Sequence, residues 1–331
     1  MTQTTPEISV VICAYSDKRW DDLVAAVESV RGQTVPAKEI IVVIDHNEPM
    51  LQRLQARFTE PDFIAVPNKR TRGLSGARNS GVAVAHGDIV AFIDDDAIAA
   101  PDWLQWLAAS YNDKVLGVGG PVQPFWLEGR PSWFPEEFDW VVGCTFLGMP
   151  ETTTRVTKLI GCNMSFRREV FAEVGGFRTD MGRVGTKPIA GEETEFSIRV
   201  CQRWPDKELI YEPRARVQHR VPAARANWGY FRSRSYYEGL SKALVAQLVG
   251  TVDGLATERT YATRTLPRGV ARGIADLPLR RDPAGVARAA TIAAGLGITV
   301  YGYAQAKVAQ RIKALRHREH SAALTPEDHL I

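Results

Sequence analysis

The sequence has few cysteines, little net charge and no evident repeat, and these absences exclude several classes of protein. Its four cysteines are scattered along 331 residues without a C-x-x-C pair, which argues against a structural zinc site and a disulfide framework. The net charge of +3 is too small to favour nucleic acid as a partner. The first residues lack the basic segment and apolar run of a secretory signal. We therefore expect a cytoplasmic protein with no nucleic-acid partner.

Two phosphate-binding motifs are also missing, the P-loop pattern G-x-x-x-x-G-K-[ST] and the dinucleotide pattern G-x-G-x-x-G. A different glycine-rich stretch, NKRTRGLSGARNSGV, occupies residues 68–82 and contains Arg78. Its glycines would let the backbone approach a ligand closely, and Arg78 could reach a diphosphate or a base. A helix of small residues packed tightly on a sheet explains the same stretch equally well.

The first hundred residues alternate between strand and helix patterns. Short apolar runs rich in β-branched residues, typical of strands covered on both faces, occupy residues 8–13, 39–44, 63–66 and 89–93. Helical spacing occurs between them and again later in the chain, at 21–31, 49–58, 73–85, 168–174, 192–203 and 228–248. The order predicts an α/β fold, a mostly parallel sheet with helices on both faces.

Polar residues follow three of the predicted strands. Ala14 and Tyr15 follow the first strand, Asp45 follows the second, and residues 94–96 follow the fourth. Because ligands bind beyond the carboxyl ends of parallel strands, we expect these residues to meet at one rim of the sheet.

Residues 94–96 place three aspartates side by side, where their charges repel and where strand propensity is poor. A divalent cation would offset that charge, since Mg²⁺ and Mn²⁺ bind through one or two carboxylates together with substrate phosphates. Asp94 and Asp96 would both reach one such ion. A solvated acidic turn is the alternative, because a D-x-D pattern alone is a weak signal.

Five longer segments, which follow one another along the chain, include these motifs. They are SVVICAYSDKRWDDLVAAVESVRGQT, EIIVVID, RGLSGARNSGVAVAHGDIVAFIDDDA, GCNMSFRREVFAEVGGF and GEETEFSIRV. Over roughly residues 7–240 they resemble the family 2 glycosyltransferases, which have the GT-A fold and use nucleotide-diphosphate sugars. The resemblance implies a Rossmann-like sheet, inversion at the anomeric carbon and a divalent metal, Mn²⁺ or Mg²⁺.

The resemblance also implies roles for the rim residues. A nucleotide-diphosphate sugar, with UDP as the favoured nucleotide, would lie across the edge of the sheet. Asp96 would be the main metal ligand with Asp94 beside it, and His219 stands where similar enzymes place a histidine near the metal or the diphosphate. A structural histidine is the alternative for His219. The residues implied around the nucleotide sugar are Ala14, Tyr15, Asp45, Arg78, Asp94 and Asp95.

The segment GEETEF (191–196) stands where the family usually has Glu-Asp, the Asp being the base that deprotonates the acceptor hydroxyl. The matching position here is Glu193, whose side chain is one methylene longer, so Glu192 remains the second candidate. We favour Glu193. A structural role is the alternative, because negative charge is also favourable at the start of a helix.

Three further residues are candidate contacts to the donor sugar or the acceptor. Asn163 lies in a predicted turn under the donor sugar. Arg232 and Arg234 stand beside aromatic residues in FRSRSYYEG, and arginine suits a lipid phosphate or the leaving diphosphate. A solvated helix face would explain both arginines as well.

The C-terminal part differs in composition. Residues 250–283 are rich in Gly, Pro and Arg, and are expected to form a linker or a lipid- or partner-facing segment. As a helix, the uncharged run 289–306 would span about 27 Å, just short of a hydrocarbon core. We expect weak or peripheral contact with the cytoplasmic face of a membrane, with a packed soluble helix as the alternative. The basic residues after this run are Lys307, Arg311, Lys313, Arg316 and Arg318.

These observations predict a GT-A domain at 1–240, with a nucleotide-sugar-binding half at 7–120 and an acceptor-binding half at 121–240. A helical C-terminal extension would occupy 241–331. The predicted function is metal-dependent transfer of a hexose to an acceptor hydroxyl, in cell-envelope or lipid-linked glycan synthesis.

Two alternative functions stay open. A nucleotidyltransferase that forms sugar nucleotides should carry a glycine-rich loop after the first strand, and CAYSDKRW has no glycine. A non-catalytic saccharide-binding module would be favoured by loss of the carboxylates at 94–96 or 192–193, and both sets are present.

Overall fold

A computed structural model describes residues 6–182 and 190–323, without the side chains of 256, 257 and 316–323. The predicted basic side chains of Arg316 and Arg318 therefore lie outside the described residues.

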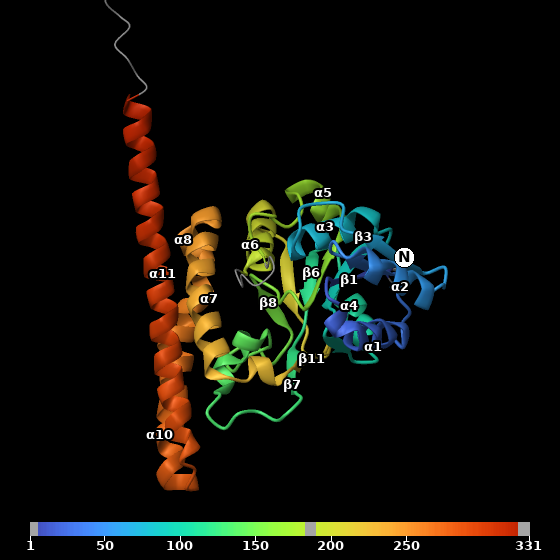
Figure 1. Cartoon of the computed structure of the whole chain (residues 1–331). Coiled ribbons are helices and arrows are strands. Elements are labelled where there is room, and N and C mark those ends of the chain that lie inside the picture. Colours follow the sequence, from blue (N-terminus) through green and yellow to red (C-terminus); the bar gives the residue numbers. More distant parts are fainter. Residues whose placement is uncertain (1–5, 183–189, 324–331) are drawn as a thin grey trace, which may run out of the picture.

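An eight-stranded sheet forms the centre of the molecule, as Figure 1 shows. Its strand order is β3-β2-β1-β4-β9-β6-β10-β8. Strand β9 runs antiparallel to β4 and β6, β8 runs antiparallel to β10, and the other neighbours are parallel. The predicted α/β class is confirmed. The strands are β1 (Ile8–Ala14), β2 (Glu39–Ile44), β3 (Phe63–Pro67), β4 (Ile89–Asp94), β6 (Val115–Gly119), β8 (Thr154–Val156), β9 (Asn163–Arg167) and β10 (Glu208–Tyr211).

Helices cover both faces of this sheet because successive strand residues point to opposite sides. On β1, Val10 and Ile12 pack in one core cluster, whereas Val11 packs in another. The first cluster lies under α1 (Trp20–Arg31), α2 (Glu48–Arg57) and α4 (Trp103–Ala109). The second lies under α3 (Leu74–Val84), α5 (Arg168–Val174) and α6 (Glu192–Arg203).

A small second sheet of order β5-β11-β7 brings the second half of the chain to the three aspartates. Strand β11 (Val217–Val221) lies between β5 (Ala97–Ala99) and β7 (Val122–Trp126). His219 pairs in register with Ala97, the residue directly after Asp96. The histidine thus lies within a strand, and the sheet register places it beside the acidic rim.

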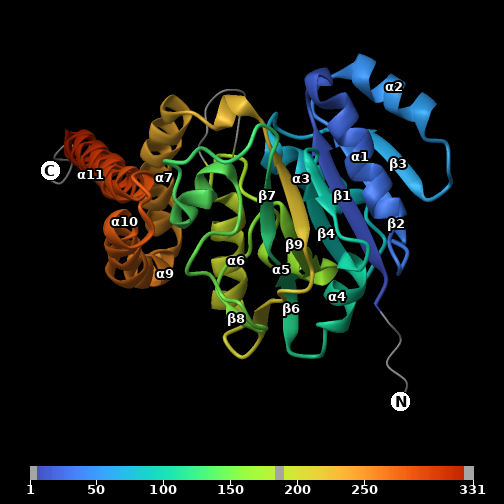
Figure 2. The same cartoon turned by 90° about the horizontal axis from the view of Figure 1, so that it is seen from below.

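Most of the described C-terminal part is helical, so residues 250–283 are not the linker that was one of the two predicted alternatives. The other alternative, a lipid- or partner-facing segment, stays a prediction. Helix α7 (Trp228–Val249) runs through the predicted domain boundary at 240. The segment after it forms α8 (Thr251–Gly254), α9 (Ala256–Thr260), a π-helical turn η4 (Tyr261–Thr265) and α10 (Leu266–Arg280). The last helix is α11 (Ala284–Ala323), and Figure 2 shows α7, α9, α10 and α11 gathered on the side away from α1 and α2.

Candidate active site

A cavity of about 1280 Å³ lies beyond the carboxyl ends of the parallel strands β1 and β4. This is where parallel α/β sheets bind ligands, and the volume exceeds what a single small molecule fills. Its lining joins the predicted rim to α6, α7 and the C-terminal helices. The predicted site residues on its wall are Ala14, Tyr15, Asp45, Arg78, Asp94, Asp95, Asp96, Glu192, Glu193, His219 and Arg234.

Asp94, Asp96 and His219 form a compact group of metal-ligand type. One ligand atom from each lies within 4.8 Å of the others. Asp94 is half-buried, whereas Asp96 and His219 are buried. The Nε2 atom of His219 is 3.1 Å from Oδ1 of Asp96, so the ring nitrogen faces the carboxylate directly.

Two arginines share this acidic group. Arg19, in the short 3-10 helix η1 (Asp17–Arg19), places Nη1 2.8 Å from Oδ1 of Asp95 and 3.1 Å from Oδ2 of Asp96. Arg225, in η3 (Ala223–Arg225), places Nη2 3.1 Å from Oδ2 of Asp96.

These neighbours separate the pKa values of the two buried aspartates. Burial alone would raise the pKa of Asp96, but His219, Arg225 and Arg19 outweigh it and hold that pKa well below its usual range. Burial and the charge of Asp96 raise the pKa of Asp95 to about 7.

The donor set of this group fits a divalent cation. Within the described part of the chain, the Oδ2 atom of Asp95 is buried without a hydrogen-bond partner. Carboxylate oxygens suit both Mg²⁺ and Mn²⁺, but an imidazole nitrogen beside them favours the transition metal. Asp94, Asp96 and His219 are the residues that would hold such an ion.

The buried side chain of Arg78 connects the acidic rim to the start of α6. Its Nη1 donates to Oε1 of Glu192 at 2.8 Å, and its Nη2 donates to the carbonyl oxygen of Gly161 at 3.1 Å. The same Nη2 lies 3.6 Å from Oδ1 of Asp94. Arg78 thus holds Glu192 in a salt bridge and leaves the neighbouring Glu193 without that partner.

Glu193 also lines the cavity, and its carboxyl group is in a setting suited to a base. Burial, followed by the charge of Glu192, raises the pKa of Glu193 to about 8. A carboxylate with a pKa near physiological pH accepts a proton more readily than an ordinary one.

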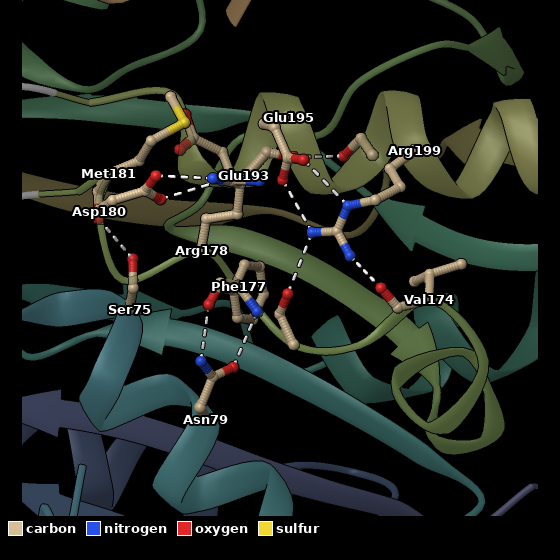
Figure 3. Close-up of polar contacts among 12 residues, drawn as sticks. Ser75, Asn79, Val174, Phe177, Arg178, Asp180, Met181, Glu193, Glu195 and Arg199 are labelled. Atoms are coloured by element: carbon tan, nitrogen blue, oxygen red, sulfur yellow. Dashed lines mark hydrogen bonds and ion pairs between the residues drawn. The ribbon is translucent and has the colours of Figure 1, made fainter. Parts of the chain in front are cut away.

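Contacts around the start of α6 fix the segment before it, as Figure 3 shows. The side-chain amide of Asn79 donates to the carbonyl oxygen of Phe177 at 2.7 Å and accepts from its N–H at 2.8 Å. Ser75 donates to the carbonyl oxygen of Met181 at 2.9 Å. Farther along α6, Arg199 pairs with Glu195 at 2.8 Å. Residues 177–181 are therefore fastened to α3, the helix that also carries Arg78.

The rim residues predicted to surround the nucleotide base differ in their exposure and in their hydrogen bonds. Tyr15 is 53% exposed and free to stack on a ligand, while Ala14 is buried beside it. Asp45 already accepts hydrogen bonds from Asn68 at 2.6 Å and from the N–H of Gly73 at 2.9 Å. Asp45 thus shapes the loop before α3 as well as lining the cavity.

Two of the predicted contact residues, Asn163 and Arg232, lie outside the cavity lining. The amide of Asn163 is fully buried in β9, where it accepts from Trp103 Nε1 at 2.8 Å and donates to the carbonyl oxygens of Pro121 and Ala215. Its hydrogen-bonding groups are therefore committed to the core. Arg232 is exposed on α7 outside the cavity lining, whereas Arg234, two residues on, is buried and lines the cavity.

Sequence reasoning missed several cationic residues on the cavity wall, among them Arg19, Arg225, Lys158 and Lys242. Arg19 was the easiest to find, because it follows the first strand by only five residues, in SDKRW. The other three come from separate segments that only the fold brings together, and their local sequences carry no signal for it.

The sequence profile described as Glycosyl transferase family 2 matches residues 9–175. The glucosyl-dolichyl phosphate glucuronosyltransferase of Haloferax volcanii is 39% identical over 242 residues, which cover 72% of this chain and 77% of that protein. The succinoglycan biosynthesis protein ExoM of Rhizobium meliloti is 25% identical over 249 residues, covering 72% of this chain and 75% of that protein.

Solved structures show the same architecture. The mannosyltransferase PcManGT from Pyrobaculum calidifontis, in complex with GDP-Man and Mn²⁺, gives a TM-score of 0.55 at 17% identity, covering 90% of this chain and 88% of that one. GalNAc-T7 with UDP, GalNAc and Mn²⁺ gives 0.51 at 18% identity, covering 75% and 55%. These likenesses concern the fold and confirm the predicted GT-A architecture. On its profile match and its 39% identical relative, the chain belongs to glycosyl transferase family 2 and is a glycosyltransferase.

Proposed function

We propose that the protein transfers a hexosyl or hexuronosyl group from a UDP-sugar to a hydroxyl of a lipid-linked saccharide, with a divalent metal and with inversion. One observation carries the proposal: a single cavity contains both a metal-type group, Asp94–Asp96–His219, and a carboxylate with a raised pKa, Glu193. Transfer of a sugar from a donor to an acceptor needs both groups, the metal site and the base, in one enclosed space.

The donor would lie along the rim. Tyr15 and Asp45 would contact the base, with Ala14 leaving room between them, and Asp94 would reach the ribose. Asp94, Asp96 and His219 would hold Mn²⁺, which supplies positive charge to a diphosphate leaving group. The buried Arg78 and the Asp95–Arg19 pair would position the aspartates rather than contact the sugar.

Glu193 would accept the proton of the acceptor hydroxyl as that oxygen attacks the anomeric carbon. Glu192 is the weaker candidate, because its carboxylate is held by Arg78 at 2.8 Å and serves to fix the start of α6. A single displacement by the acceptor oxygen, on the face opposite the leaving diphosphate, gives inversion.

Two observations support a lipid-linked acceptor. The 39% identical relative is named for action on glucosyl-dolichyl phosphate. The helix segment Ala284–Leu315 is long enough to cross a membrane, and its most apolar 18-residue window has a mean hydropathy of 1.3 with only 28% of that window buried. This helix agrees with the name of the relative. We place the enzyme at the cytoplasmic face of a membrane.

Membership of glycosyl transferase family 2 leaves no support for the two alternative functions, a sugar-nucleotide-forming nucleotidyltransferase and a non-catalytic saccharide-binding module.

The test is nucleotide release from a panel of UDP-, GDP- and dTDP-sugars, with a polyprenyl-phosphate-linked sugar as acceptor, with Mn²⁺ or Mg²⁺ and with chelator. We expect release from one UDP-sugar that Mn²⁺ supports best and chelator abolishes. Asp96→Ala should lose donor binding, and Glu193→Gln should bind donor but lose transfer by about 10²–10⁴-fold. Glu169→Gln, an exposed carboxylate on α5, is the matched control and should behave as wild type. Undiminished release in chelator would overturn the metal assignment.

A further inference from the structure

The cavity has a second region, away from the aspartates, that the donor does not need. Its side chains come from the loop between the 3-10 helix η2 (Glu136–Val142) and β8, from η4, from the start of α10 and from α11. We call them the apolar wall: Phe146, Met149, Tyr261, Leu266, Leu296 and Val300.

Beside the apolar wall lie two lysines that converge on one carboxylate oxygen. The Nζ atom of Lys158 is 2.6 Å from Oε1 of Glu258, and the Nζ atom of Lys242 is 2.8 Å from the same oxygen. Lys242 also pairs with Glu238 at 3.0 Å. All four residues line the cavity. Two ammonium groups that share one oxygen of Glu258 form a site where a phosphate, with its larger charge and several oxygens, would bind both lysines better than the Glu258 carboxylate does.

This lysine pair lies close to the proposed base. Lys242 bonds to Glu238, and the charge of Glu238 contributes to the raised pKa of Glu193. A sugar attached directly to a lipid phosphate needs this closeness, because a single sugar ring separates its hydroxyls from the phosphate.

The apolar wall also reaches the outside of the molecule. Val300 lines the cavity and is 57% exposed, within the apolar helix segment Ala284–Leu315. The wall is therefore continuous with the outward face of α11, the surface expected to meet lipid. An apolar chain that enters beside Val300 would keep contact with apolar side chains on its way into the cavity.

From these contacts we propose that Lys158 and Lys242 bind the phosphate of an isoprenoid-type lipid acceptor in place of the Glu258 carboxylate, and that the apolar wall holds the first part of its hydrocarbon chain. The proposal rests on the proposed function and names the acceptor site within it.

The test measures binding of geranylgeranyl phosphate to the full-length protein by tryptophan fluorescence, since Trp140 lies on the cavity wall. Geranylgeraniol and inorganic phosphate are the two partial ligands. We expect the complete ligand to bind at least tenfold more tightly than either part. Lys158→Met should weaken it at least tenfold without changing geranylgeraniol binding, whereas Glu258→Gln, which removes the competing charge, should tighten it severalfold.

The apolar wall is tested with a matched pair on one helix. Val300→Ser should weaken both lipids, whereas Val308→Ser, equally exposed at 57% but outside the cavity, should change neither. Equal binding of the complete ligand by wild type, Lys158→Met and Glu258→Gln would overturn the phosphate site, and so would no binding at all.

Donor binding, measured in parallel on the same variants, separates this proposal from the proposed function. Lys158→Met that still binds the UDP-sugar but not the lipid phosphate supports both. Wild type that fails to bind any donor would overturn the proposed function, whatever the lipid result.

Discussion

At the scale of single residues, the pKa of Glu193 predicts how transfer depends on pH. A base must be deprotonated to accept a proton, and burial raises the pKa of Glu193 to about 8. We expect kcat/KM to rise close to tenfold per pH unit below 8 and to level above it. The measurement is transfer with saturating metal between pH 6 and 9. A flat profile would exclude Glu193 as the group that titrates.

The same shift affects stability with a definite sign. A carboxyl whose folded pKa is raised binds its proton more tightly in the folded state, so its contribution to stability is lost as pH rises from about 4.5 to about 8. Glu193→Gln removes this loss. The variant should therefore be more thermally stable than wild type at pH 8.5, with a smaller difference at pH 5.

The buried pair Arg78–Glu192 should matter more for folding than for chemistry. Both side chains are under 5% exposed, and their closest atoms are 2.8 Å apart. Arg78→Met would leave the Glu192 carboxylate buried and unpaired, at a cost of about 3–5 kcal/mol in the free energy of unfolding. Adding Glu192→Leu should recover part of that loss, measured by urea unfolding. An additive double variant would show that the two charges are not coupled.

Some residue roles were predictable and others were not, for one reason. The rim residues Tyr15 and Asp94 lie at the carboxyl ends of strands, and the direction of the strands alone places them at the cavity. The roles of Asn163 and Arg232 depend instead on the direction of their side chains, which the sequence does not give. The sequence around Asn163 does not reveal that Trp103 and two carbonyl groups take up its amide.

At the scale of elements, α7 and α11 approach each other through glycines. A Cβ at Gly239 would lie 2.1 Å from the carbonyl oxygen of Thr299, and one at Gly302 would lie 2.3 Å from that of Tyr236. Gly239→Ala should therefore push the helices apart and lower the free energy of unfolding by about 1–3 kcal/mol. Gly297→Ala, with no atom within 4 Å of its Cβ, is the control and should stabilise by up to about 1 kcal/mol. Thermal unfolding measures both, and equal midpoints would contradict the close packing.

The helices within residues 250–283 were not predicted, because glycine and proline usually interrupt helices. Here Gly273 packs against Gly285 at the contact between α10 and α11, where a Cβ would lie 2.5 Å from a carbonyl oxygen. Pro267 falls in the first turn of α10, where its missing N–H costs nothing. The strands and helices of the first hundred residues were predictable because their periodicity reports burial directly.

At the scale of the whole molecule, α11 extends past the sheet-containing part at both ends, with α7 and α10 along its side, as Figure 1 shows. A membrane crossed perpendicularly by α11 would also enclose α7, with its charged Glu238 and Lys242. The arrangement therefore favours contact in the plane of the membrane surface. The last turn of α10, next to the start of α11, adds Leu277 at 47% and Leu279 at 80% exposure.

This geometry predicts binding to anionic vesicles through the end of α10. Arg280 and Arg281 are exposed beside Leu279, so phosphatidylglycerol vesicles should bind more protein than phosphatidylcholine vesicles, and salt should weaken binding. Replacing Leu277 and Leu279 by Ser removes about 3 kcal/mol of apolar burial and should lower partitioning at least tenfold in a flotation assay. Leu127→Ser, 45% exposed after β7, is the control and should bind as wild type. If all three proteins float equally, the membrane contact is not made through the end of α10 and lies elsewhere on the molecule.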